Sequence, residues 1–307
     1  MPTKNQKQFI AGAICALSIQ VPVWGQSNPA TNNMASFATG FTHTAATAQS
    51  NKVGAGIDTV GGTPTPVEAR PWLVAVVETW NNDNYARFKC GATLLSSTWA
   101  VTAAHCVNQY EKKEKDIALV AGIISLKDKS AKRTNIVKIF LYKSWNPDTK
   151  DSDIALLKIE PITLGPKVRP VAYLRSAQGG LAKIGAEITV TGWGATTTGV
   201  AYDVISNDGN VSIVSSDACQ QSDKEKKITI NMICAIGKNK NQTIVDTCQG
   251  DSGGPAVLNA SSASPILAGI TSDSTGKSCG QPGHYGIYTR ISNFAPWIDE
   301  TIKANTP

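Results

Sequence analysis

The sequence has little that could cross a membrane and little that could bind a nucleic acid. Its one long apolar stretch, residues 9–23, is broken by polar residues and a proline, and it falls short of the roughly 20 residues that a membrane-spanning helix needs. The net charge is only +6. The basic runs at 112–115 and 224–227 each contain a glutamate and no aromatic residue, which is typical of solvated loops. We therefore expect no nucleic-acid partner.

The N-terminus has the three parts of a secretory signal peptide. Lys4 and Lys7 precede the apolar stretch, and the residues around Gly25 supply a cleavage site. We expect residues 1–25 to be removed on export, so that the mature protein is secreted, extracellular or periplasmic, and not held at a membrane. Residues 26–51 contain no Lys, Arg, Asp or Glu, and such a segment has little to bury. Residues 26–58 are therefore interpreted as a pro-segment or a flexible linker.

Cysteines are few, and none of them forms a Cys-x-x-Cys pair, which argues against a zinc site. Of the seven, Cys15 lies in the expected signal peptide. The even number that remains predicts disulfides in an oxidising compartment, although the count does not choose among the possible pairings. The remaining cysteines are Cys90, Cys106, Cys219, Cys234, Cys248 and Cys279.

From about Thr59 onward, short apolar runs rich in β-branched residues alternate with turn residues. Runs of this length and spacing predict an all-β sandwich or barrel. The end of the chain differs, because Phe294, Trp297, Ile298 and Ile302 recur at helical spacing after a polar cap. This pattern predicts a short amphipathic C-terminal helix. The apolar runs are residues 72–77, 117–120, 136–142, 154–159, 187–191, 210–214, 266–271 and 286–291.

One segment carries a serine suited to nucleophilic catalysis. Residues 250–255 read Gly-Asp-Ser-Gly-Gly-Pro, with Ser252 between glycines. A serine hydroxyl needs a base to take its proton and backbone N–H groups aimed at the developing oxyanion. Flanking glycines allow the sharp turn that exposes such groups. A phosphate-binding loop is not favoured, because no Lys-Ser or Lys-Thr follows.

A base and an acid occur in two other segments. The chain has only three histidines, and His105 stands in Thr-Ala-Ala-His-Cys at 102–106. Asp153 stands at the start of an apolar run, in Asp-Ser-Asp-Ile-Ala-Leu-Leu at 151–157. Taken alone, a single histidine is usually structural or incidental, and an acid before a strand usually belongs to a surface turn. Neither residue identifies a site without the serine.

Together, the three segments resemble the trypsin–chymotrypsin family of serine endopeptidases. The order His105, Asp153, Ser252 is the order of that family and differs from those of subtilisins and α/β-hydrolases. Gly-Trp-Gly at 192–194, Cys-Gly-Ala-Thr-Leu at 90–94 and Met-Ile-Cys-Ala at 232–235 also match its motifs. The resemblance covers roughly residues 59–302.

The resemblance implies a fold and a set of roles. Residues 59–307 would form a trypsin-like peptidase domain of two six-stranded antiparallel β-barrels, with the active site between them and a short C-terminal helix. His105 is implied as general base, Asp153 as its orienting acid and Ser252 as nucleophile, with the N–H groups of Gly250 and Ser252 as the oxyanion hole. The implied disulfides are Cys90–Cys106, Cys219–Cys234 and Cys248–Cys279.

The resemblance also implies that no cofactor takes part. A calcium loop of the trypsin kind is not expected either, because the stretch after Gly122 reads Ile-Ile-Ser-Leu and lacks the carboxylates that a hard cation needs. We therefore expect no metal site.

The resemblance places the specificity pocket around Asp246. This residue lies six positions before Ser252, where trypsin-like members have the acid at the floor of the primary pocket, so cleavage after Arg or Lys is implied. Ser272, expected to contact the triad acid, and Gly286 keep the family pattern. The pocket wall departs from it, because Asp273-Ser274 replaces the usual Trp-Gly.

The two replacements bear on which substrates fit. Ser274 adds a side chain at the pocket entrance, and Asp273 predicts a preference for a basic residue in the neighbouring subsite. A specificity other than Arg or Lys is the alternative, if these two side chains block long cationic ones.

The activation site has two candidates. Val-Gly-Gly at 60–62 resembles the end of the Ile-Val-Gly-Gly start of mature family members. The new amine would then belong to Thr59 and would pair with Asp251. The other candidate is cleavage after Lys52, which would leave six extra residues.

The expected function is that of a secreted serine endopeptidase that hydrolyses peptide bonds through an acyl-enzyme. Its partners would be protein or peptide substrates and protein protease inhibitors, and it would act as a monomer. The alternative is a catalytically weak or inactive homologue that serves as a secreted binding module. The presence of all three triad residues and the oxyanion-hole glycine favours the enzyme.

Overall fold

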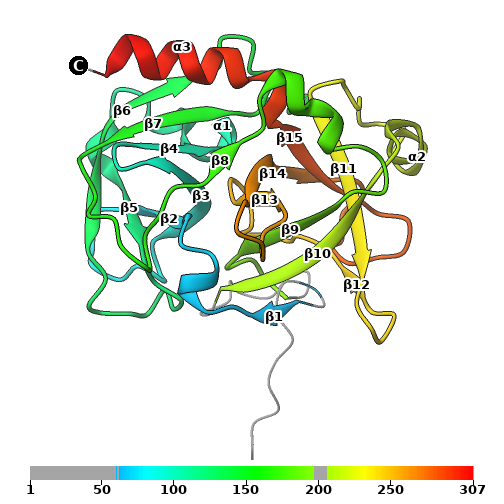
Figure 1. The fold of residues 1–307 in the computed structure, drawn as a ribbon, viewed down its shortest axis with the longest axis horizontal. Helices are drawn as coiled ribbons and strands as arrows, with labels where there is room; N and C mark the ends of the chain where they lie inside the picture. Colours follow the sequence, from blue (N-terminus) through cyan, green and yellow to red (C-terminus); the bar gives the residue numbers. More distant parts are fainter. Residues whose placement is uncertain (1–59, 61, 197–205, 307) are drawn as a thin grey trace, which may run out of the picture. The chain divides into compact units, whose positions relative to one another are not determined.

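Antiparallel strands form two closed barrels in the computed structural model, which describes residues 60, 62–196 and 206–306 (Figure 1). The first barrel closes in the order β2-β3-β4-β7-β6-β5. The described residues all belong to one compact unit. The expected signal peptide, pro-segment and first mature residue Thr59 lie outside the described residues. The strands of the first barrel are β2 (Leu73–Glu78), β3 (Phe88–Ser96), β4 (Trp99–Thr102), β5 (Ile117–Ala121), β6 (Arg133–Leu141) and β7 (Ala155–Ile159).

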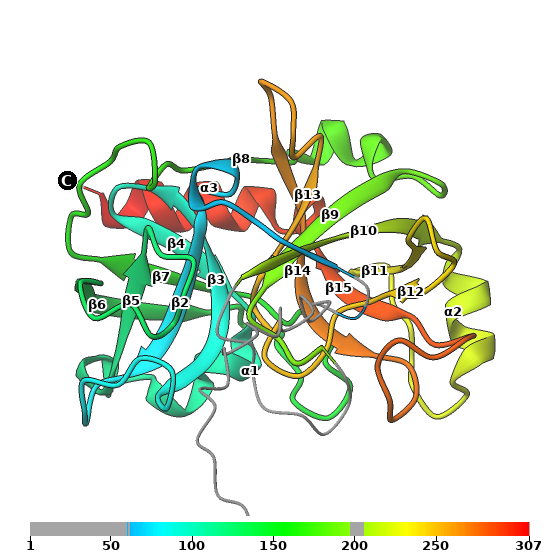
Figure 2. The same ribbon diagram turned by 90° about the horizontal axis from the view of Figure 1, so that it is seen from below.

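The second barrel lies beside the first, as the two views show (Figures 1 and 2). Its strands pair in the order β10-β9-β13-β14-β15-β11, and the pairing of β10 with β11 closes the ring. Short strands β1 (Thr63–Pro64), β8 (Ala172–Tyr173) and β12 (Ile244–Val245) extend it. The predicted fold of two six-stranded barrels is therefore confirmed. The ring consists of β9 (Glu187–Gly192), β10 (Asn207–Val214), β11 (Met232–Lys238), β13 (Pro255–Leu258), β14 (Ile266–Ser274) and β15 (Gly286–Arg290).

Strand β2 is apolar from Leu73 to Val77 because both of its faces are buried there. Successive side chains of a strand point to opposite faces. Val74 and Val76 pack in the core of the first barrel, whereas Leu73, Ala75 and Val77 pack in a second cluster with Trp193. Trp193 follows β9 of the second barrel. The outer face of β2 is therefore apolar because it packs in a cluster that includes a residue of the second barrel. Strand β10, by contrast, alternates buried and more exposed positions.

Two further contacts hold the barrels together. Trp193 Nε1 donates a hydrogen bond of 2.7 Å to the carbonyl of Ile124 in the first-barrel half of the chain. Helix α3 (Ala295–Asn305) follows β15 of the second barrel but packs on the first, where Figure 1 shows it beside β6 and β7. Trp297 meets Tyr142 edge-on, with 5.3 Å between ring centroids, and Ile298 is fully buried. The predicted C-terminal helix is thus confirmed.

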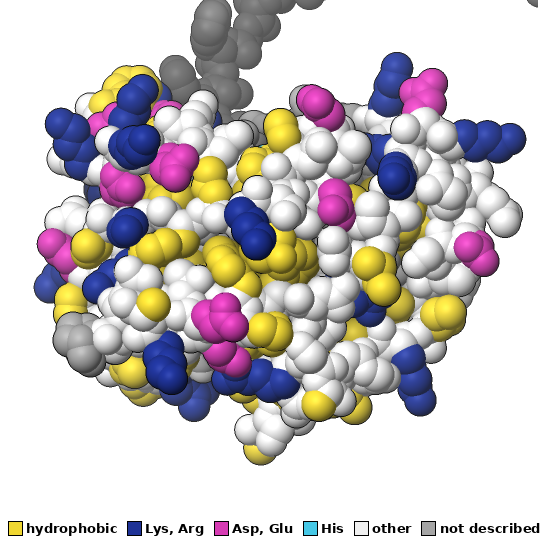
Figure 3. Space-filling model, turned by 90° about the horizontal axis from the view of Figure 1, so that it is seen from above, with side chains coloured by type: hydrophobic (Ala, Val, Ile, Leu, Met, Phe, Trp, Pro, Cys, Tyr) yellow, Lys and Arg dark blue, Asp and Glu magenta, His cyan; other side chains and the backbone are white. Residues whose placement is uncertain are grey.

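Charged side chains of both signs are interspersed on the face that carries α3. Figure 3 shows Lys and Arg among Asp and Glu there, with hydrophobic side chains between them. One such pair joins Arg175 to Asp299 of α3. On this face the basic residues form no continuous patch. In the described part of the chain, no helix has the length and apolar character needed to cross a membrane.

A buried ion pair also links the two halves. Arg70, in the loop before β2, contacts Asp208 of β10 through Nη2 (2.6 Å) and Nε (3.2 Å). Arg70 Nη1 donates to the carbonyl of Ala260 at 3.1 Å, and Thr191 Oγ1 donates to Asp208 at 2.7 Å. Burial raises the pKa of Asp208, and Arg70 and Thr191 only partly oppose this effect. The pair therefore depends on both partners being present.

We predict that Arg70→Ala lowers the free energy of unfolding by about 3 kcal/mol near neutral pH, because it leaves a buried carboxylate without its cation. Without Arg70 the pKa of Asp208 rises further, so the folded variant takes up a proton at a higher pH than the unfolded chain does, and the loss of stability shrinks as the pH falls. Urea unfolding followed by fluorescence measures both effects.

The matched control is Lys167→Ala, which removes a cation paired with Glu68 where both side chains are more than half exposed. We expect its effect to stay below about 1 kcal/mol. Equal, small losses for the two variants would contradict a structural role for the Arg70–Asp208 pair.

Candidate functional site

His105 and Asp153 are brought together by the pairing of β4 with β7. The two strands are antiparallel, with Thr102 opposite Ala155, so the end of β4 meets the start of β7. His105 follows β4 on the short helix α1 (Ala104–Val107), and Asp153 precedes β7. Asp153 Oδ2 lies 2.7 Å from His105 Nδ1, and Oδ1 accepts the backbone N–H of His105 at 2.9 Å.

Hydrogen bonds from both barrels surround the buried Asp153. The side chain has no solvent exposure. Ser272 Oγ of β14 donates to Oδ2 at 2.6 Å, and Thr289 of β15 donates to the Asp153 carbonyl at 2.8 Å. Burying a carboxylate is costly unless its oxygens accept hydrogen bonds. Here three donors reach the carboxylate, namely the backbone N–H and ring Nδ1 of His105 and the hydroxyl of Ser272. Since an ionised carboxylate only accepts, Nδ1 of the neutral His105 ring carries the proton, and Nε2 is left free to act as a base.

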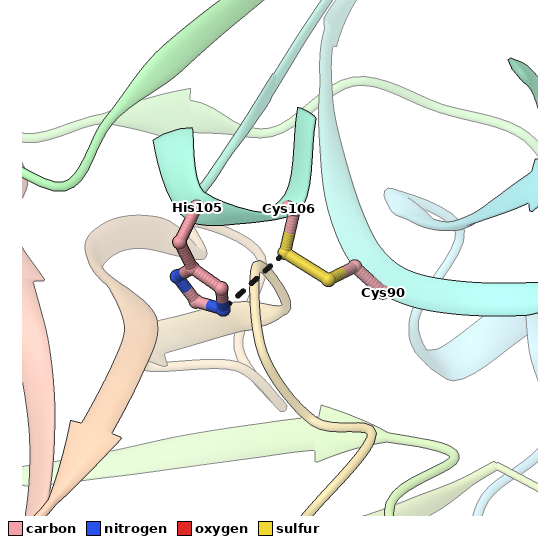
Figure 4. A group of neighbouring side chains, drawn as sticks. All are labelled: Cys90, His105 and Cys106. Carbon is pink, nitrogen blue, oxygen red and sulfur yellow. Dashed lines mark hydrogen bonds between the residues drawn. A yellow bond between two sulfur atoms is a disulfide. The ribbon is translucent and has the colours of Figure 1, made fainter. Parts of the chain in front are cut away.

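The free face of the His105 ring borders a disulfide. Nε2 lies 3.7 Å from Cys106 Sγ, and Cys106 is bonded to Cys90 of β3 (Figure 4). Neither atom carries a hydrogen when the ring is neutral, so this is a packing contact. His105, Cys90 and Cys106 also form the one candidate metal cluster found among the described residues. Because the two sulfurs are bonded to each other, neither is a thiolate that could bind a metal.

The turn that carries Ser252 docks against the strands next to His105. The carbonyl of Ser252 accepts the N–H of Gly91 at 2.8 Å. The next residue, Gly253, has a φ of +77°, and a Cβ there would lie 2.2 Å from Thr102 Oγ1 and 3.2 Å from Cys106 Sγ. Only glycine fits this approach. The turn therefore lies directly beside the disulfide that His105 contacts.

No hydrogen bond joins Ser252 Oγ to His105 within the described residues. Such bonds are often long in structures without substrate and shorten when substrate binds. The structure thus places the turn of the predicted nucleophile beside the disulfide that borders the predicted base, and the base is hydrogen-bonded to the predicted acid.

Asp251 fixes the turn before the serine. Its buried carboxylate accepts the N–H groups of Gly194 (2.9 Å) and Cys248 (3.0 Å), and Gly250 adopts a φ of +101°. Among the residues described, the backbone N–H groups of Gly250 and Ser252 have no acceptor. Two N–H groups held in a rigid turn suit the binding of a negatively charged oxygen.

The predicted pocket acid lies deep in the second barrel. Asp246 is fully buried, and it accepts the N–H groups of Thr247 (2.8 Å) and Gly280 (3.1 Å). Burial raises its pKa to about 7, and those two hydrogen bonds only partly offset the effect. In the part of the chain that the structure describes, no Lys or Arg forms an ion pair with Asp246, and such a buried carboxylate is suited to receive a cation from a ligand.

Gly286 lies closely against Asp246 and Tyr288. A Cβ at this position would lie 2.6 Å from Tyr288 Oη and 3.0 Å from Asp246 Oδ1. Ser274 pairs with Gly286 across β14 and β15, so it lies beside this glycine. The structure therefore brings together the pocket residues that the sequence predicts, Asp246, Ser274 and Gly286.

Lys226, which lies near the predicted pocket, was not found from the sequence. Asp273 forms an ion pair with Lys226, and its Oδ1 accepts the N–H of Ser274 at 2.8 Å. Lys226 lies 47 positions away, in a run that reads as a solvated loop. No local pattern signals that this lysine reaches the rim of the site.

The disulfide pairs implied by the resemblance are the pairs found. Cys90 bonds to Cys106, Cys219 to Cys234 and Cys248 to Cys279. The last pair joins the turn before Ser252 to the segment that holds Gly280, so it fixes the two sides of the pocket to each other.

Comparisons with known proteins agree with this architecture. The trypsin family model matches residues 59–298, which is more than half of the chain. Trypsin from Sus scrofa is 34% identical over 248 residues, covering 80% of this chain and 96% of that protein. Trypsin from Phaedon cochleariae is 32% identical over 250 residues, covering 80% and 89%.

A solved structure has the same fold. Neuropsin, a serine protease expressed in the limbic system of mouse brain, superposes with a TM-score of 0.65 at 30% identity, covering 78% of this chain and 98% of neuropsin. With a matching family model, curated relatives above 30% identity and this shared fold, the chain belongs to the trypsin family of serine proteases.

Proposed function

We propose that this protease is a secreted endopeptidase that cleaves after Arg or Lys, with Ser252 as nucleophile, His105 as general base and Asp153 as the acid that orients the base. Family membership already makes it a serine protease that acts on protein or peptide substrates. The observation that carries the assignment of roles is the 2.7 Å contact of the buried Asp153 with His105 beside the Ser252 turn.

The geometry supports the following steps. His105 Nε2 takes the proton of Ser252 Oγ as that oxygen attacks the substrate carbonyl. The developing oxyanion accepts the free N–H groups of Gly250 and Ser252. Asp153 stabilises the imidazolium that forms, and the imidazolium then donates its proton to the leaving amine. Water attacks the acyl-enzyme by the same route, which regenerates Ser252.

The buried Asp246 supports cleavage after Arg or Lys. A cationic side chain that enters the space beside Gly286 would supply the counter-charge that the carboxylate lacks, and a charge-assisted hydrogen bond is stronger than a neutral one. Ser274 at the pocket border adds a hydroxyl, not an apolar side chain that would block the way.

Export and activation complete the proposal. All cysteines after the expected signal peptide are paired, which suits an oxidising compartment. Val60, next to the expected mature start, packs by the Cys248–Cys279 disulfide, and its carbonyl accepts the N–H of Asp246 at 3.3 Å. A cleavage before Thr59, the residue that precedes Val60, would therefore act close to the pocket acid. Inhibition by protein inhibitors, a monomeric state and independence of cofactors stay predictions.

We predict that Ser252→Ala lowers turnover of peptide substrates by at least ~10³-fold, because it removes the attacking oxygen. Chromogenic peptides with Arg, Lys, Phe or Ala before the scissile bond, assayed with the purified mature protease, measure this and rank the specificity. The matched control is Ser264→Ala, an exposed serine, which should behave as the unmodified enzyme.

Each of three outcomes would contradict a part of the proposal. Turnover that survives in Ser252→Ala would remove this serine as nucleophile. Turnover of only the Phe or Ala peptides would overturn the specificity for Arg and Lys. Absence of Ser252-dependent turnover on every peptide would favour the binding module.

We also predict that binding of a small aryl amidine weakens as the pH falls through about 7. The raised pKa of Asp246 means that the free site takes up a proton there, and the neutral acid no longer attracts a cation. Calorimetry on the Ser252→Ala variant between about pH 8 and pH 5.5 should show affinity falling by up to ~10-fold per pH unit below that point.

The control is the same titration after adding Asp246→Asn. That variant keeps His105, so any pH dependence that arises from the histidine persists in it. We expect weak binding with a flat pH profile. An unchanged pH profile in Asp246→Asn would show that Asp246 is not the group responsible.

A further inference from the structure

Lys226 and Asp273 join two segments at the rim of the candidate site. Asp273 lies in β14 between Ser272, which donates to the triad acid, and Ser274, which pairs with Gly286 at the pocket. Asp273 therefore lies in the strand between the residue that contacts the triad acid and the residue that borders the predicted pocket. Lys226 Nζ forms an ion pair with Asp273 Oδ2.

The loop that carries Lys226 is anchored at several points. Asp223 accepts the N–H groups of Glu225 (3.1 Å) and Lys226 (3.3 Å) through one oxygen, and that of Gly276 (3.1 Å) through the other. Gln220 on α2 (Ser216–Ser222) donates to the carbonyls of Asp223 and Lys226. The loop is thus fixed to the segment after β14, and Lys226 is held near Asp273 before the pair forms.

This arrangement changes the expected effect of Asp273 on substrates. An unpaired aspartate at the rim would attract a basic residue. Here the side chains of Lys226 and Asp273 are 31% and 29% exposed, and their charges cancel. The fixed loop also lowers the entropy that a flexible lysine would lose on pairing.

The pair lies where an extended peptide would bind. Strand β13 pairs with β14 only from Ile266 to Ile270. Among the described residues, no strand covers Asp273 and Ser274 on the edge opposite β15. An open strand edge binds extended peptides by main-chain hydrogen bonds, so the side chains that precede the scissile bond would pass this ion pair.

We propose that Lys226 is a specificity-determining residue, which by pairing with Asp273 keeps the subsites before the primary pocket electrically neutral. The substrates favoured there are peptides with uncharged residues before the Arg or Lys that enters the pocket. The inference rests on the proposed function, because that function places the peptide along β14.

The test compares Lys226→Ala with Lys224→Ala, an exposed lysine of the same loop whose loss changes the net charge equally. Peptides with Arg before the scissile bond carry Lys or Gln at each of the three preceding positions in turn. In the unmodified enzyme we expect kcat/KM for Lys and Gln peptides to differ by less than about two-fold.

Lys226→Ala should raise the Lys-to-Gln ratio by about five-fold at one of the three positions, and added salt should reduce this gain. Lys224→Ala should leave the ratio unchanged, and adding Asp273→Asn to Lys226→Ala should restore it. A ratio that stays unchanged in Lys226→Ala, or that rises equally in Lys224→Ala, would overturn the inference.

A binding measurement separates this inference from the proposed function. The same peptides, labelled with a fluorophore, are titrated with Ser252→Ala and with Ser252→Ala carrying Lys226→Ala, and the dissociation constants are read by anisotropy. Loss of all turnover together with the same shift in the Kd ratio would overturn the proposed function and support the role of Lys226. Turnover after Arg together with an unchanged Kd ratio would support the proposed function and overturn the role of Lys226.

Discussion

The buried carboxylate of Asp153 stands where the two barrels meet, and the geometry of the site depends on the donors around it. The backbone and ring of His105 reach the carboxylate from the first barrel, and Ser272 reaches it from the second, where Thr289 also donates to the main-chain carbonyl of Asp153. A fully desolvated charge tolerates little change in its donors, because each unmet hydrogen bond is costly. The orientation of the His105 ring is therefore coupled to the relative position of the barrels.

The acids of the second barrel show how environment separates chemically identical side chains. Asp251 is surrounded by backbone N–H groups and fixes the turn before Ser252. Asp246 is also buried, yet burial outweighs its donors, and its pKa rises to about 7. Asp273 is partly exposed and has a lysine as partner. In this arrangement Asp251 is structural, Asp246 is suited to a cationic ligand, and the charge of Asp273 is neutralised by Lys226.

The departures from the family pattern lie on the wall of the site rather than among the reacting groups. The residues around Ser252, His105 and Asp153 follow the family, whereas Asp273 and Ser274 replace the usual Trp-Gly. The charge of Asp273 is paired with that of Lys226, on a different loop. Replacing an aromatic residue by an ion pair exchanges an apolar surface for a polar one, which changes the side chains that can pass without altering the chemistry.

The sequence by itself determined the β-rich architecture and the C-terminal helix, and its resemblance to the family implied the candidate site residues and the disulfide pairs. These follow from local patterns: the spacing of apolar residues, the glycines around Ser252 and short motifs such as Gly-Trp-Gly. Only the tertiary structure decided that β2 is buried on both faces, with Trp193 in the cluster on one of them, that Arg70 pairs with Asp208, and that Lys226 reaches Asp273. Each of these joins residues far apart in the chain, and no local periodicity records a partner that folding brings from 47 or more positions away.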